Sequence, residues 1–194
     1  MISLQNIQAL KLIIESVEKS LEHKNYFASL ATIFILLDLC SKIESPEEKS
    51  NRQRYIKWIE NYLEDSMQSD NYYLTAENIY YLRCSMLHEG STNPTTQSNY
   101  LKYADKKVSD IVAGVFDNTD KKIFAVDQGE ENPTLFIDIE YFCVKINREV
   151  RNWIKEYEEQ INDAEVYPFS IAFSAPSTDG NRLLIWRSQP GPNT

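Results

Sequence analysis

Two residues of this sequence, Arg83 and His88, carry side chains suited to chemistry on a phosphate, and both lie in the segment IYYLRCSMLHEGS, residues 79–91. An imidazole has an unperturbed pKa of about 6.5, so His88 is suited to proton transfer near neutral pH. The guanidinium of Arg83 presents a planar fork of donors that matches phosphate oxygens. The pair predicts proton transfer beside a bound phosphate. The structural alternative is a bundle arginine paired with an acid and a histidine favoured by the dipole at a helix C-terminus.

In an ideal α-helix the two side chains do not converge. Five residues at 100° each place them about 140° apart around the axis and about 7.5 Å apart along it. Arg83 is then expected near Ile79, with its stem packed in the bundle, and His88 on the opposite side. The spacing predicts a homodimer that brings two copies of the pair together about a two-fold axis, with the C-terminal half of this helix in the interface.

Asp38 is the first candidate partner for the arginine. It follows the apolar run IFILL, residues 33–37, and a carboxylate in such a run is costly to bury alone. We expect it to pair with Arg83 and to orient the guanidinium toward phosphate. The alternative is a helix-edge position in water.

Composition limits the kind of protein. The chain has 194 residues, of which 42% are hydrophobic, so one domain with a substantial core is expected. The net charge is −9, so any contact with a polyanion must be local. Three widely spaced cysteines in apolar surroundings favour a reducing compartment, and no leader or membrane span is recognised, so we expect a soluble, cytoplasmic protein.

Common cofactor motifs are missing from the sequence. Neither of the two histidines is paired with Cys or Asp at ligand spacing, and the five glycines form no phosphate-binding loop. No GxSxG-type nucleophile context occurs. We therefore expect neither a metal ion nor another cofactor.

Apolar periodicity predicts a mainly α-helical protein. Helical spacing is found over residues 2–22, over an almost uniformly apolar segment 25–43, and over a third segment around 55–63. A fourth helix is predicted from Thr75, as N-cap, to Gly90, which can adopt the left-handed conformation. Asp138 is predicted to cap a last helix that runs to Ile161.

Short β-like runs precede that last helix. The segments DIVAGVF, KIFAV and TLFI predict a small antiparallel meander, at about residues 106–137, inserted into a helical domain of residues 1–162. Residues 163–194 are predicted to form a C-terminal hairpin or an extended tail.

The segment LRCSMLHEG, with its Arg-x4-His motif, resembles the HEPN superfamily, and in particular its Apea-like bacterial branch. The likeness covers about residues 24–160 and includes the helix end LLDLCSKI and the last helix IEYFCVKINREVRNWI. It implies an antiparallel bundle of four to five helices and, in many members, a metal-independent ribonuclease that works as a dimer with a shared cleft. The residue after Arg83 is Cys84, where catalytic members often have Asn or another polar residue.

The resemblance implies cleavage of single-stranded RNA by attack of the 2′-OH on the neighbouring phosphate, with His88 and Arg83 as catalytic residues. It also implies a toxin or an antiviral-defence effector, with an antitoxin of the nucleotidyltransferase type as a partner. Asp38, Cys84 and Tyr80 are supporting candidates. Tyr80 and the basic cluster of Arg52, Arg54 and Lys57 are weaker candidates for RNA contact; the alternative for Tyr80 is packing, which tyrosine-rich helix faces usually serve. The alternative is a non-catalytic HEPN-like module that binds RNA, nucleotide or a protein partner.

Overall fold

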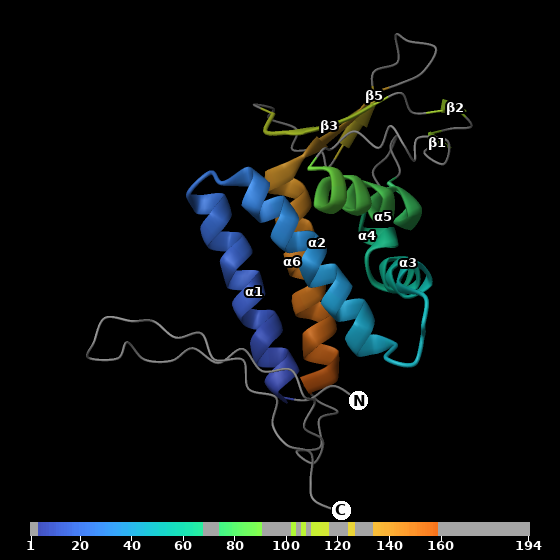
Figure 1. Ribbon diagram of the computed structural model, residues 1–194. Helices are drawn as coiled ribbons and strands as arrows, with labels where there is room; N and C mark the ends of the chain where they lie inside the picture. The colour runs from blue at the N-terminus through green and yellow to red at the C-terminus, as the bar shows by residue number, and fades with distance from the viewer. Residues whose placement is uncertain are drawn as a thin grey trace, which may run out of the picture.

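The computed structural model describes residues 4–67, 74–90, 102–103, 106–107, 110–116, 124–126 and 134–158. The described part is mainly helical, as the periodicity predicted (Figure 1). The long helices are α1 (Leu4–Glu22), α2 (Tyr26–Glu44), α3 (Asn51–Tyr62) and α6 (Ile139–Glu158). The short α4 (Glu64–Met67) follows α3, and α5 (Ala76–Cys84) continues into a π-helical turn, η1 (Ser85–Glu89).

Helices α1, α2 and α6 form the centre of the fold, and they are not all antiparallel. Contacts between Lys11 and Glu158 and between Glu18 and Arg151 show that α1 runs against α6. In contrast, the start of α2 contacts the start of α6 through Tyr26 and Glu140, and their ends meet at Glu44 and Trp153. These two helices are therefore parallel, and the predicted antiparallel bundle is wrong in this respect (Figure 1).

Helix α2 is the core helix that its almost uniform apolarity predicted. Its residues Ile33, Phe34, Leu36 and Leu37 are fully buried, because α1, α3 and α6 all pack against it. By length and composition it is also the one helix among the described residues that is able to cross a membrane. Burial against three neighbouring helices is the ordinary situation of a core helix in a soluble protein, and the structure is compatible with one.

The far ends of α2, α3 and α6 meet around the carboxylate of Glu44. It accepts hydrogen bonds from the Tyr62 hydroxyl at 3.0 Å, from the indole N–H of Trp153 at 3.3 Å, and from the Tyr157 hydroxyl. Burial and the hydrogen bond to Glu44 raise the pKa of Tyr157 far above its usual range. This hub fixes α3 across the pair of parallel helices.

The helix boundaries follow local capping rules. Ser50 and Thr75 accept hydrogen bonds from backbone amides two or three residues into α3 and α5, and Asp138 does the same for Tyr141 in α6. Gly90 ends η1 with a φ of 64°, the left-handed conformation predicted for it. The Thr75, Gly90 and Asp138 predictions are confirmed.

The sheet differs from the predicted meander. Strand β5 (Thr134–Asp138) lies in the centre, parallel to β3 (Asp110–Gly114) and antiparallel to β4 (Phe124–Val126). A separate two-residue pairing joins β1 (Lys102–Tyr103) and β2 (Lys106–Lys107). The antiparallel meander is therefore wrong. Leu135 and Ile137 of β5 are buried in the core, and this strand takes the central position rather than the edge position that chain order suggests.

Some predictions fall on residues that the structure does not describe. The end of the last helix at Ile161, the domain boundary at residue 162 and the C-terminal hairpin or tail of residues 163–194 lie outside the described residues.

Candidate functional site

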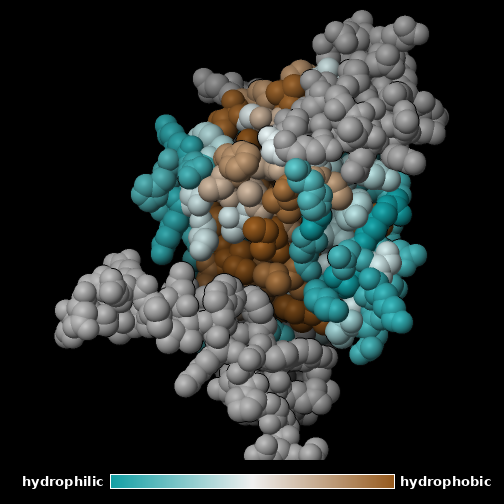
Figure 2. All heavy atoms as spheres, in the orientation of Figure 1, coloured by the Kyte–Doolittle hydropathy of each residue, from teal (hydrophilic) through white to brown (hydrophobic). Residues whose placement is uncertain are grey.

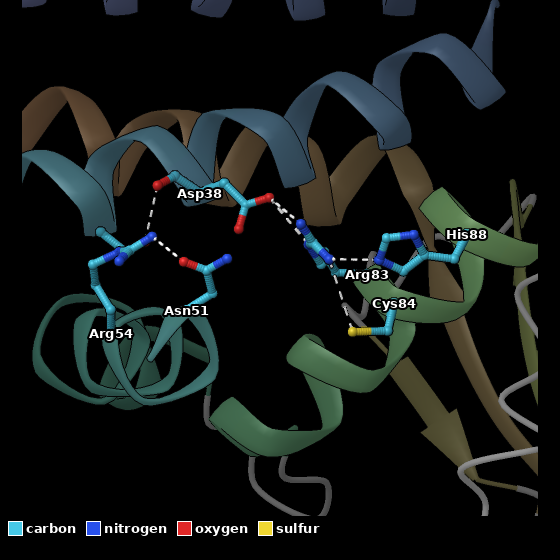
Figure 3. A network of polar contacts seen from close by, with 7 residues as sticks. Asp38, Asn51, Arg54, Arg83, Cys84 and His88 are labelled. Atoms are coloured by element: carbon cyan, nitrogen blue, oxygen red, sulfur yellow. Dashed lines mark hydrogen bonds and ion pairs between the residues drawn. The ribbon is translucent and has the colours of Figure 1, made fainter. Parts of the chain in front are cut away.

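The turn that carries His88 is a π-turn, and this brings His88 back over Arg83. The amide of Gly90 donates to the carbonyl of Met86 at 3.1 Å and is shared with the carbonyl of Ser85, an i→i+5 bond, in η1. Such a turn holds one more residue than an α-turn, so side chains five positions apart come onto one side. Arg83 Nη1 lies 3.1 Å from His88 Nε2 (Figure 3). The predicted divergence of the two side chains is wrong, because it assumed α-helical geometry throughout.

The contact between the guanidinium and the imidazole is a hydrogen bond in one tautomer of His88. A guanidinium has N–H donors and no acceptor, so in that tautomer Nε2 is the acceptor and the ring proton lies on Nδ1. His88 is exposed and ends the helix, whereas Arg83 is half-buried. The contact therefore places the imidazole at the surface with a cation directly beside it.

The other side of the guanidinium is held by Asp38, as the sequence predicted. Arg83 donates to the same carboxylate oxygen of Asp38 from Nη2 at 2.6 Å and from Nε at 3.0 Å. The side chains are 19% and 32% exposed, so this ion pair is largely protected from water. Burial lowers the pKa of Arg83, but the hydrogen bonds and charge of Asp38 outweigh it, and the net shift is upward. Asp38 thus fixes Nε and Nη2 and leaves Nη1 for another acceptor.

Cys84 is buried beneath the pair. Its Sγ lies 3.9 Å from Arg83 Nη1, a distance for a weak hydrogen bond to sulfur. The thiol therefore adds a soft acceptor on the inner side of the guanidinium. It occupies the place where a stronger polar group would form a full hydrogen bond.

Tyr55 of α3 is a neighbour that the sequence reasoning did not connect to this site. Its ring is fully buried, and its hydroxyl has no hydrogen-bond partner among the described residues. Burial and the charge of Asp38 raise the pKa of Tyr55 well above its usual range. Only its position on the apolar face of α3 was readable from the sequence, because the approach of α3 to Asp38 depends on the tertiary fold.

Tyr80, Tyr81 and Arg52 form a second cluster one turn before Arg83. The guanidinium of Arg52 lies 5.9 Å from the ring centroids of both tyrosines. It also donates to Glu77 at 2.5 Å and to the Tyr81 hydroxyl at 3.4 Å. Tyr80 is half-buried and Tyr81 is buried. Arg52 and Tyr80, both predicted as RNA-contact candidates, therefore lie together next to the Arg83 site.

The remaining basic candidates are placed differently. Arg54 donates to the side chain of Asn51 at 2.6 Å and to the carbonyl of Glu48 at 2.8 Å, and Figure 3 shows it on the other side of Asp38 from Arg83. Lys57 is exposed on α3. Arg54 is thus engaged in fixing the start of α3.

The described residues contain no group of three or more His, Cys, Asp or Glu side chains that could hold a metal ion. The site offers a guanidinium nitrogen, Arg83 Nη1, that Asp38 does not engage, an imidazole in contact with it, and a carboxylate that keeps the guanidinium oriented. This set is suited to binding an oxyanion and moving a proton beside it.

Comparison of the chain with models of protein families, with curated proteins and with solved structures finds no match.

Proposed function

We propose that the protein is a metal-independent endoribonuclease of the HEPN type that cleaves single-stranded RNA. The observation that carries the proposal is the contact of Arg83 Nη1 with His88 Nε2 at 3.1 Å at an exposed helix end. The resemblance of the Arg-x4-His motif to the HEPN superfamily supports the same reaction class. Asp38 supports it by holding the guanidinium in place from the inner side.

In this mechanism the substrate provides the nucleophile. The 2′-oxygen forms a bond to the adjacent phosphorus while the bond from phosphorus to the 5′-oxygen breaks, and the products are a 2′,3′-cyclic phosphate and a 5′-OH. A phosphate oxygen replaces His88 Nε2 as the acceptor of Arg83 Nη1, and the guanidinium stabilises the charge of the transition state. This releases the lone pair on His88 Nε2, which takes the proton of the 2′-OH. DNA lacks the attacking group and is not cleaved.

A homodimer is part of the proposal, because the reaction also needs a proton donor for the leaving oxygen. The chain has one other histidine, His23, which lies at the end of α1 and contacts the Lys19 carbonyl. A second copy supplies a second His88. The surface of α2 supports self-association: Phe27 is 63% exposed and Ile35 is 47% exposed, and Ile35 lies one turn from Asp38. Figure 2 shows apolar side chains along this face, with polar side chains on both sides.

The alternative is a non-catalytic helical module that binds RNA, nucleotide or a protein partner. Two observations favour it: the net charge of −9, which repels RNA, and the position of the weakly polar Cys84 beside the guanidinium. The catalytic proposal implies a toxin of a toxin–antitoxin system, with an antitoxin of the nucleotidyltransferase type, or an antiviral-defence effector. Identifying the genes next to this one tests whether the protein belongs to such a system.

The deciding experiment compares single-stranded RNA with DNA of the same sequence. We expect the protein to cleave only the RNA and to leave 2′,3′-cyclic phosphate ends. His88→Ala is expected to lower the rate by about 100-fold or more, the effect of losing a general acid–base group. The matched control is His23→Ala, which removes the other histidine and is expected to cleave like the parent. Absence of cleavage by the parent protein, or full activity of His88→Ala, supports the binding-module alternative.

A further inference from the structure

We propose that Tyr80 and Arg52 form a subsite that stacks a nucleobase of single-stranded RNA beside the phosphate held by Arg83. This inference rests on the proposed function. It adds the place where the substrate is held next to the bond that breaks. Its evidence is the placement of one half-buried aromatic ring and one guanidinium immediately next to the Arg83 site.

The first step is position along α5. Tyr80 precedes Arg83 by three residues, and residues with this spacing are neighbours on a helix surface, with about 5–6 Å between their Cβ atoms. A base stacked on Tyr80 therefore belongs to a nucleotide that adjoins the phosphate at Arg83. The substrate chain is then held at two points on one helix face.

The second step is the fixed orientation of the Tyr80 ring. Tyr55 meets it edge to face at a centroid distance of 5.6 Å, and Tyr81 does the same at 5.8 Å. Tyr55 and Tyr81 are themselves buried, so they hold the ring of Tyr80 in place before any ligand binds. A base that stacks on a fixed ring loses little of its interaction energy to ordering of the protein.

The third step concerns Arg52, whose guanidinium lies 5.9 Å from the centroid of Tyr80. Unstacked RNA bases bind both to aromatic rings and to guanidinium planes. The bond of Arg52 to Glu77 joins side chains that are 43% and 51% exposed, and such a surface ion pair contributes little to stability. Arg52 is therefore able to leave Glu77 and cover a base that enters beside Tyr80.

Because the protein has a negative net charge, base stacking is a more suitable source of affinity for RNA than electrostatic attraction. With a net charge of −9 the protein does not attract RNA in general, and the charge of Arg52 is balanced by Glu77. Base stacking needs no net charge and tolerates any base, because every base has an aromatic face. We expect a subsite without strong sequence preference.

The experiment measures binding of fluorescent tetranucleotides to the full-length His88→Ala protein by anisotropy, so that cleavage does not interfere. One probe is single-stranded RNA, and the other is the matching ribose-phosphate oligomer without bases. Tyr80→Leu keeps an apolar side chain but removes the aromatic face. We expect it to weaken binding of the base-bearing RNA by about 5-fold or more and to leave binding of the abasic oligomer unchanged.

Two further variants separate stacking from packing. Tyr80→Phe keeps the ring and is expected to rescue the binding lost in Tyr80→Leu. The matched control is Tyr141→Leu, which truncates a half-buried tyrosine on α6 and is expected to bind both probes like the parent.

The outcomes distinguish the subsite from the function. Equal affinity of Tyr80→Leu and its parent for the base-bearing RNA, or equal losses on both probes, overturns the subsite alone when the wild-type protein cleaves RNA. No binding of either probe, together with no cleavage by the wild-type protein, overturns the proposed function and the subsite with it.

Discussion

The ion pair between Asp38 and Arg83 gives the sharpest quantitative prediction. Asp38 accepts two hydrogen bonds from the guanidinium, at 2.6 Å and 3.0 Å, and the side chains of Arg83 and Asp38 are 19% and 32% exposed. Breaking a fully buried pair costs about 3–5 kcal/mol, whereas an exposed pair contributes about 0–1 kcal/mol. This pair lies between the two, so we expect Asp38→Asn to lower the free energy of unfolding by about 1–3 kcal/mol.

A double-mutant cycle isolates the contact from the other effects of each substitution. The cycle uses Asp38→Asn, Arg83→Gln and the double variant, and the expected coupling is about 1–2 kcal/mol. Urea unfolding followed by tryptophan fluorescence measures it, since Trp58 and Trp153 are both 1% exposed. For a chain of this size each kcal/mol corresponds to about 2–4 °C in melting temperature.

The matched control is the ion pair between Glu18 and Arg151, which also joins two helices, at 2.9 Å, but with side chains 44% and 45% exposed. Its coupling is expected to be below about 0.5 kcal/mol. If the two cycles give equal coupling energies, the argument that Asp38 holds the guanidinium against solvent is refuted. RNA cleavage by Asp38→Asn should also fall, because Arg83 loses the group that orients it.

Three further predictions address mechanism, assembly and stability. Cleavage of RNA is expected to persist in EDTA, and a complete loss that added divalent ions restore contradicts the metal-free mechanism. Sedimentation at micromolar concentration is expected to show a dimer that Ile35→Glu dissociates, because a charge is placed on the exposed apolar side of α2. A monomeric parent contradicts the proposal that a second copy supplies the proton donor. Glu44→Gln is expected to lower the free energy of unfolding by about 1–3 kcal/mol in urea, since the carboxylate of Glu44, at the end of α2, accepts hydrogen bonds from side chains of α3 and α6. Unchanged stability argues against this role of Glu44.

Much of the helical framework is readable from local sequence. Apolar periodicity located the helices, and short-range rules found the caps at Thr75 and Asp138 and the left-handed end at Gly90. The pairing of Asp38 with Arg83 was also predictable, because an isolated carboxylate on an apolar helix needs a partner. Each of these inferences depends on residues within one helix or on the cost of burying a charge.

The relative order and direction of the elements was not readable. Strand β5 lies between β3 and β4, and α2 is parallel to α6, although neighbouring elements in sequence most often lie side by side. An amphipathic pattern indicates which side of a helix or strand is buried, but not which other element packs against that side. Long-range packing decides which elements become neighbours.

In the candidate site, too, local sequence decides some features and long-range packing decides others. The sequence by itself determined the residue types of Arg83 and His88 and their spacing of five positions, from which an α-helix predicts divergent side chains. Only the tertiary structure decided that the turn is a π-turn, in which Nη1 and Nε2 meet at 3.1 Å. A π-turn needs no special residue types, so local sequence does not distinguish it from an α-turn. Here the turn lies where Ser85 and Met86 are buried and Asp38 of α2 fixes the guanidinium, and these contacts between helices set its geometry.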